Sequence, residues 1–179
     1  MASVTGLTID DFERLPDDLA HNHELVDGEL IDVSGNTGEH NSLRDWLIAL
    51  LLPYVKQHHL GKVLSEQEYQ FGSNAHGPDV SFFGAEKALL YDRSRRVQRL
   101  VPDLAIEIVS QNDKFEALMK KARRYRNCGT KEVWIFSIAL REAYVLSEKH
   151  DALLDENQQF RSDLIPGFSI RIGDLFDRI

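Results

Sequence analysis

The sequence has few of the residues that cross-link a chain or anchor it in a membrane. Its one cysteine, Cys128, cannot form an internal disulfide, and no CxxC or Cys/His spacing of a zinc site is present. The longest apolar run, Trp46 to Leu52, is far too short to cross a bilayer, and the first twenty residues contain acidic side chains without a long apolar core. A glycine-rich phosphate loop is also missing, so nothing supports an NTPase or a dinucleotide-binding protein. We therefore expect a cytoplasmic protein that does not enter a membrane.

The composition indicates one globular domain with an uneven charge distribution. With 42% hydrophobic and 28% charged residues, the 179-residue chain is long enough to bury a core, and we expect a single domain over residues 1–179. The net charge of −8 argues against a nucleic-acid partner. However, residues 1–40 hold ten acidic and one basic side chain, whereas residues 93–131 hold eleven basic and four acidic ones. A local basic zone is therefore either a nucleic-acid surface or an ordinary solvated face.

Periodicity and turn residues predict a mixed α/β fold. The predicted helices are residues 7–15 with Thr8 as N-cap, about 41–60 ended by Gly61, about 112–127 ended by Gly129, and a last turn in the tail. The predicted strands are a hairpin at residues 23–33 turning at Asp27-Gly28, then residues 62–71, 78–83, the segment around Glu107, a second hairpin at 132–137 and 142–147, and an extended segment in the tail. Residues 72–77 and 84–100 are predicted to be loops, the second of them exposed.

Glu107 is the residue that first indicates chemistry. It lies inside the run Leu104 to Val109, which has the length and the apolar character of a strand covered on both faces. An ionised carboxylate in a dry site costs several kcal/mol unless it is paired, so Glu107 should be neutral, salt-bridged or bound to a metal.

Asp79 offers a partner for Glu107. It begins the strand at residues 78–83 and should point to the face opposite Val80 and Phe82, as Glu107 should point opposite Ile106 and Ile108. If the two strands are neighbours, the carboxylates converge, and oxygen ligands of this kind suit Mg²⁺ or Mn²⁺. The alternative is a structural Glu107 paired with Arg or Lys.

The helix after Glu107 contributes a lysine. At 100° per residue, the apolar residues form one stripe, which consists of Phe115, Leu118, Met119, Ala122 and Tyr125. Lys121 lies at the border of this stripe, whereas Lys120 and Arg124 should point well away from it. Lys114 shares the border with Lys121, so helical geometry does not choose between them. Such an ammonium could orient or deprotonate a water, or stabilise charge on phosphorus, or it could simply be a surface lysine.

Several segments in order resemble the blocks of the Uma-type family, which is grouped with the PD-(D/E)xK, or restriction-endonuclease-like, nucleases. These are LTIDDFER, HELVDGEL, GPDVSFF, PDLAIEIVS and KKARRYRNCGTKEVWIFS, and they cover nearly the whole chain. The resemblance implies a restriction-endonuclease-like mixed β-sheet flanked by α-helices. It also implies that Asp79 and Glu107 are the two acidic residues of the superfamily and that Glu24 completes the metal site.

The sequence departs from the superfamily pattern at one position. Val109 stands where the lysine of the (D/E)xK element belongs. In the family, that lysine lies in the following helix within a K-x-x-x-Y arrangement, which Lys121 and Tyr125 match. The resemblance also carries over His40 as an accessory group.

These observations lead to two competing hypotheses. The first is a Mg²⁺- or Mn²⁺-dependent DNA endonuclease in which Glu24, Asp79 and Glu107 hold the metal, Lys121 assists the attack on the phosphodiester, and a homodimer is expected by analogy. Basic side chains would follow the phosphate backbone, namely Arg93, Arg95, Arg96, Lys120 and Arg124. The second is a non-catalytic module on the same scaffold that binds nucleic acid or a protein, which the acidic first forty residues and the displaced lysine favour.

Overall fold

The computed structural model describes residues 6–110 and 114–179 of the chain. Its helices are α1 (Ile9–Glu13), α2 (Asp17–Ala20), α3 (Gly38–Gln57), α4 (Ala85–Ala88), α5 (Phe115–Asn127) and α6 (Ile172–Phe176). Its strands are β1 (His23–Val26), β2 (Glu29–Asp32), β3 (Gly61–Ser65), β4 (Glu68–Phe71), β5 (Asn74–His76), β6 (Val80–Gly84), β7 (Val97–Gln98), β8 (Leu104–Val109), β9 (Glu132–Ser137), β10 (Glu142–Ser147), β11 (Asp151–Leu154), β12 (Gln159–Arg161) and β13 (Ser169–Arg171).

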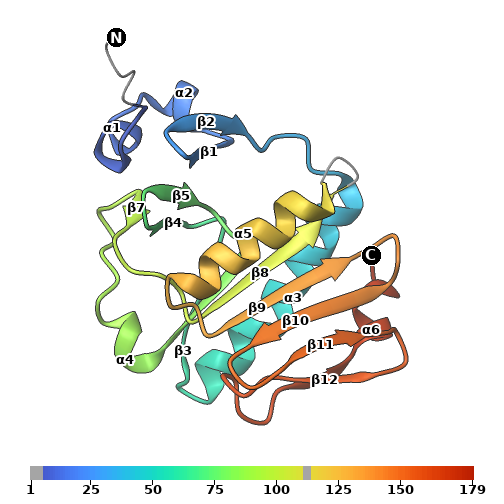
Figure 1. Ribbon diagram of the computed structural model, residues 1–179. Helices are drawn as coiled ribbons and strands as arrows, with labels where there is room; N and C mark the ends of the chain where they lie inside the picture. Colours follow the sequence, from blue (N-terminus) through green and yellow to red (C-terminus); the bar gives the residue numbers. More distant parts are fainter. Residues whose placement is uncertain (1–5, 111–113) are drawn as a thin grey trace.

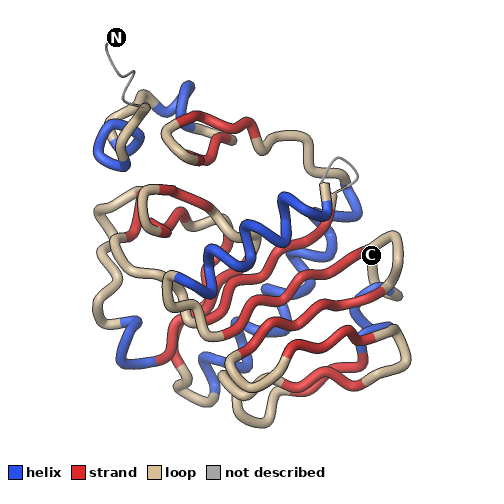
Figure 2. The backbone as a smooth tube through the Cα atoms, viewed as in Figure 1, coloured by secondary structure: helices blue, strands red, loops and turns tan. Residues whose placement is uncertain are grey.

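A six-stranded mixed sheet forms the centre of the molecule, in the order β11-β10-β9-β8-β6-β3 (Figures 1 and 2). Strands β8 and β9 are parallel and are joined through α5, whereas β6 and β8 are antiparallel neighbours. Because side chains alternate along a strand, Leu104, Ile106 and Ile108 of β8 pack with α3 on one face. Glu107 consequently points to the opposite face, where α5 lies.

A second sheet, in the order β2-β1-β5-β4-β7, carries the N-terminal helices. The chain passes from the central sheet into this one between β3 and β4, where Glu66 has a left-handed φ of 48°. A small apolar cluster seats α1 on the second sheet through Phe12, Leu25 and Val97. Tyr69 and Phe71 of β4 pack against α5, so this helix lies between the two sheets. The layers thereby bring β1 and β5 of the second sheet and β8 of the central sheet around α5.

The predicted α/β fold with a mixed sheet between helices is confirmed, and so are both predicted hairpins and the capping box of Thr8 and Asp11. The long helix begins earlier than predicted, after Thr37, and Gly61 begins β3 instead of ending the helix. Of the predicted helix at 112–127, residues 112 and 113 lie outside the described residues.

Three predictions about the remaining elements were wrong, and two strands were missed. Residues 62–71 form two strands in different sheets, because the backbone turns at Glu66. The predicted loops at 72–77 and 84–100 contain β5, and α4 with β7, respectively. The C-terminal region contains β11 and β12 in addition to the predicted elements. Phe115 is 55% exposed at the start of α5, where it contacts Tyr144 and not the core.

No helix in the described part of the chain combines the length and the apolar character that a bilayer span requires.

Asp103, directly before β8, joins several elements at one end of the central sheet. Its buried carboxylate accepts a hydrogen bond of 2.8 Å from the Gly84 amide and lies 3.3 Å from the ammonium groups of Lys87 and Lys131. Burial opposes ionisation, but the amide and the two lysines outweigh it and hold the pKa of Asp103 below its ordinary value of 3.8.

We therefore expect Asp103→Asn to lower the free energy of unfolding at pH 7 by about 1–3 kcal/mol. A carboxylate with a lowered folded-state pKa stabilises the protein above the pKa of the unfolded state, and this contribution disappears as the pH falls through the folded-state pKa. The difference between variant and wild type should therefore shrink as the pH falls below about 3.8. Urea unfolding at several pH values measures it, with the exposed Asp151→Asn as control. A difference that stays constant with pH would contradict the assignment.

Candidate active site

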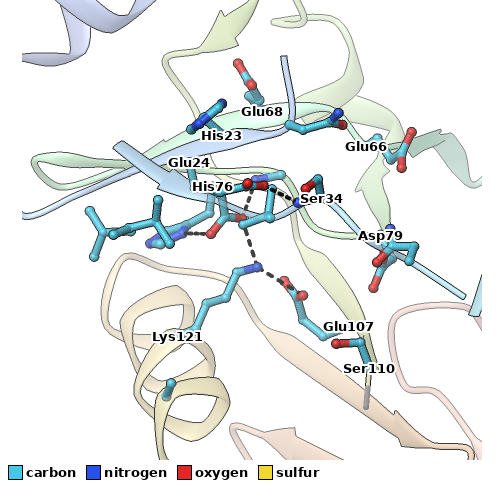
Figure 3. A pocket seen from close by; sticks show the side chains of 18 of the residues that line it. His23, Glu24, Ser34, Glu66, Glu68, His76, Asp79, Glu107, Ser110 and Lys121 are labelled. Carbon is cyan, nitrogen blue, oxygen red and sulfur yellow. Dashed lines mark hydrogen bonds and ion pairs between the residues drawn. The ribbon is translucent and has the colours of Figure 1, made fainter. Parts of the chain in front are cut away.

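A cavity of about 1060 Å³ opens between α5, the end of the central sheet and the N-terminal hairpin. Its walls carry opposite charges. Lys114, Lys120, Lys121 and Arg124 line the side formed by α5 and the residue before it, whereas Asp17, Asp18, Asp27 and Asp32 line the N-terminal side. Figure 3 shows Glu24, His76, Asp79, Glu107 and Lys121 around this space. The site is therefore built from both sheets and from α5.

Glu107 lies at the floor of the cavity and is 6% exposed. One carboxylate oxygen, Oε1, accepts a hydrogen bond of 2.7 Å from the Tyr125 hydroxyl, and Oε2 accepts one of 3.1 Å from Lys121. Burial raises the pKa of Glu107 to about 7; Lys121 opposes the rise, and the neighbouring carboxylates Asp79 and Glu24 add to it. The prediction that this residue is not an isolated charge is confirmed by its two partners.

Glu24 approaches from β1, in the other sheet. Its Oε1 lies 2.8 Å from the Lys121 ammonium and accepts a hydrogen bond of 3.1 Å from the Gly77 amide, while its Oε2 lies 2.8 Å from Nδ1 of His76. Burial alone would raise its pKa, but Lys121 and His76 lower the pKa to about 2. Glu24 is therefore the ionised member of the carboxylate pair that faces Lys121.

Lys121 lies between these two carboxylates and connects both sheets to α5 (Figure 3). Burial opposes its charge, but Glu107 and Glu24 outweigh burial and raise the pKa of Lys121. Its side chain is thus an ammonium at neutral pH. Lys114 lines the outer cavity as the N-cap of α5 and does not share the helical border. Of the two lysines that the sequence left open, the structure brings Lys121 to the carboxylates.

Asp79 lies directly before β6, beside Glu107 of the paired strand β8. Its Oδ2 accepts a hydrogen bond of 2.7 Å from the Ile108 amide, which fixes the carboxylate against β8. Its Oδ1 lies 3.3 Å from Nε2 of His40, in the first turn of α3. The expected convergence of Asp79 and Glu107 therefore occurs, and His40 contacts Asp79.

His76 and Arg124 complete the cluster. The buried His76 ring bonds Glu24 through Nδ1, and its Nε2 lies 3.0 Å from Nη1 of Arg124. The sequence patterns predict a loop at residues 72–77 and so do not reveal His76, although Gly72-Ser73 between two short runs is a hairpin signal. Arg124 was predicted to point well away from the apolar stripe of α5. It nevertheless reaches the site, because the second sheet covers this part of α5.

The donor set fits a hard divalent cation beside Asp79 and Glu107. The carboxyl groups of Glu24, Asp79 and Glu107 lie near the single ammonium of Lys121, and all three raise its pKa. Mg²⁺ commonly uses one or two carboxylates and completes its shell with water and substrate phosphate. In the described ranges 6–110 and 114–179, no three acidic, histidine or cysteine side chains form a ready-made metal cluster. The assignment of Glu24, Asp79 and Glu107 to a metal stays a prediction.

The predicted nucleic-acid-binding residues differ in their surroundings. Arg95 pairs with Glu13 of α1 and with Asp92. Arg96 pairs with Glu68 and donates to the carbonyls of Phe12 and Ala20, so both arginines hold N-terminal elements in place. Arg93 and Lys120 are exposed. Arg124 also lies 3.5 Å from Asp27 across the cavity. A role of these five residues in binding nucleic acid stays a prediction.

Removal of the Lys121 ammonium should destabilise the fold. We expect Lys121→Met to lower the free energy of unfolding by about 3 kcal/mol, because two buried carboxylates lose their shared cation while the side chain that carries it is only 18% exposed. Lys120→Met, at the exposed neighbouring position, should change it by less than about 0.5 kcal/mol. Urea unfolding of both variants measures the difference. Equal effects would show that the ammonium does not hold the two sheets together.

Comparisons with family models and with solved structures relate this chain to known proteins. The model of the Uma2 family, described as "Putative restriction endonuclease", matches residues 9–173. A crystal structure of a protein described as a "putative nuclease belonging to DUF820", from Anabaena variabilis ATCC 29413, superimposes with a TM-score of 0.84 at 20% sequence identity. The match covers 96% of this chain and 98% of that chain, and at this identity it shows a shared fold. No curated protein matches the sequence.

Proposed function

Because the chain belongs to the Uma2 family of restriction-endonuclease-like proteins, we propose that it is a Mg²⁺- or Mn²⁺-dependent endonuclease that hydrolyses phosphodiester bonds in DNA. The observation that carries the proposal is the position of the Lys121 ammonium, which is held by Glu24 and Glu107 inside a cavity whose floor also holds Asp79. A cation fixed next to two adjacent carboxylates is an arrangement suited to phosphoryl chemistry.

Asp79 and Glu107 are the residues that would hold the divalent ion. When bound, such an ion polarises the phosphate and lowers the pKa of a water molecule. Glu24 was also predicted as a ligand, and its oxygens contact Lys121, His76 and the Gly77 amide. In the proposal, the first task of Glu24 is to orient Lys121.

Lys121 acts in the proposal as a fixed cation and not as a base, because two carboxylates keep it protonated. Its role is to stabilise the negative charge that develops on the phosphate oxygens during attack. Tyr125 orients Glu107 through its hydroxyl hydrogen bond, and His40 orients Asp79. Each acidic group thus has a neighbour that restricts its rotation.

The phosphate backbone would run along the α5 side of the cavity. Lys120 and Arg124 lie on this side, and Arg93 is exposed on the loop before β7. The N-terminal side carries four aspartates that repel phosphate, so the two walls restrict the strand to one path.

We expect wild-type protein to cleave DNA with Mg²⁺ or Mn²⁺, and Asp79→Asn and Glu107→Gln to lose at least about 100-fold in kcat/KM, as is usual when a group that stabilises the transition state is removed. Both variants should also bind Mn²⁺ more weakly in calorimetry. Cleavage is measured on single-stranded, duplex and flapped substrates. Glu148→Gln, an acidic surface residue in the turn between β10 and β11, is the control.

The result also separates the enzyme from a binding module. A wild-type protein that binds DNA, retains its fold in circular dichroism and neither cuts DNA nor binds Mn²⁺ would overturn the endonuclease proposal and favour the non-catalytic alternative. In that case DNA affinity should fall steeply with salt, because phosphate contacts release counterions.

A further inference from the structure

His76 lies inside the site, where it contacts Glu24 and Arg124, and the proposed function gives it no role. It is 2% exposed, on β5, and its ring packs against the rings of Phe71 and Tyr125, whose centroids lie 5.9 and 5.6 Å from it. These two aromatic rings are themselves stacked at 4.1 Å. The orientation of the imidazole is therefore set by apolar contacts, which leaves its two nitrogens at fixed positions.

The partners of His76 determine which nitrogen carries the proton. Arg124 has only donors, so Nε2 of His76 must present a lone pair to it. The ring is then neutral with its proton on Nδ1, and this N–H donates to Oε2 of Glu24 at 2.8 Å. An imidazolium would bring a second positive charge against the guanidinium.

The two hydrogen bonds of His76 lead to different parts of the site. Through Nδ1 it fixes Glu24, whose other oxygen lies 2.8 Å from the Lys121 ammonium. Through Nε2 it fixes one nitrogen of Arg124, whose side chain is 26% exposed and lines the cavity. The other terminal nitrogen of Arg124 lies 3.5 Å from Asp27, whose side chain is 73% exposed. A substrate phosphate can replace this exposed carboxylate, whereas His76 keeps the guanidinium in place from behind.

We propose that His76 is a positioning residue that acts through its two hydrogen bonds. The bond to Glu24 orients Lys121 for the chemical step, and the bond to Arg124 holds this arginine for binding of a phosphate of the nucleic-acid strand. The inference rests on the proposed nuclease function. In it, the neutral imidazole of His76 connects Arg124, which binds phosphate, with Lys121, which acts in the chemical step.

Two substitutions each remove one of these hydrogen bonds and keep the other. In His76→Asn, the side-chain amide can still donate to Glu24 from the position of Nδ1, but nothing accepts from Arg124. In His76→Gln, the amide oxygen can still accept from Arg124 near the position of Nε2, but the donor to Glu24 is lost. His150→Asn and His150→Gln, at an exposed position in the turn before β11, are the matched controls.

The kinetic test uses Mg²⁺-dependent cleavage of a fluorescently labelled DNA substrate. We expect His76→Gln to lower kcat by about tenfold or more with KM within about twofold, and His76→Asn to raise KM by about tenfold with kcat nearly retained, the size usual for residues that orient a site from outside. If kcat falls and KM rises to the same extent in both variants, in proportion to their loss of thermal stability, His76 only supports the fold and the proposal is overturned. Wild-type kinetics in both variants would also overturn it.

A second measurement is independent of catalysis. The ¹⁵N spectrum of wild-type protein should show a neutral His76 with the proton on Nδ1, and the slowly exchanging Lys121 ammonium signal should persist in His76→Asn and disappear in His76→Gln. A proton on Nε2, or an ammonium signal that responds equally to both variants, contradicts the proposal. If the wild type cuts no DNA, the proposed function fails, and the spectrum still shows separately whether His76 donates to Glu24 and accepts from Arg124.

Discussion

The ammonium of Lys121 is the contact on which the architecture of the site depends. It lies between a carboxylate of the central sheet, Glu107, and a carboxylate of the second sheet, Glu24. Without a cation at this point, two buried negative groups would face each other, and the electrostatic cost would push the sheets apart. The same group that stabilises the interface is therefore the group placed to act on a phosphate. Stability and chemistry are coupled at one side chain.

Local patterns predicted the strand around Glu107 in the central sheet and the β1–β2 hairpin of the second sheet, but not how the second sheet is assembled. Leu104, Ile106 and Ile108 alternate with Glu107, so the strand and its faces followed from side-chain alternation. The break between β3 and β4 was not predicted, because the polar run from Ser65 to Glu68 contains no glycine or proline that would mark the backbone turn at Glu66. A strand of three residues such as β5 carries too short a pattern to stand out beside its turn.

In the candidate site, too, some residues could be predicted from local patterns and others could not. Asp79 and Glu107 were placed correctly because both lie on one sheet, in strands whose register requires them to meet. For α5, the helical wheel placed Lys121 correctly and Arg124 wrongly, because the wheel describes one packed face and α5 contacts two sheets. The choice between Lys114 and Lys121 depended on where the helix begins, and termini are the least predictable part of an element. The place of His76 in the site could not be predicted, because it depends on contacts between segments about fifty residues apart in the sequence.

Ion pairs fix α1 to the second sheet, and they affect how the number of phosphate contacts can be inferred from the salt dependence of nucleic-acid binding. Arg95 and Arg99 already lie against the carboxylate of Glu13, and Arg99 also contacts Asp10. If phosphate reaches such an arginine, one anion replaces another, and the released carboxylate takes up a cation from solution. This uptake offsets part of the counterion release that normally accompanies each phosphate contact. The slope of affinity against salt would therefore underestimate the number of arginines at the interface, and the acidic N-terminal segment would act as an internal counterion.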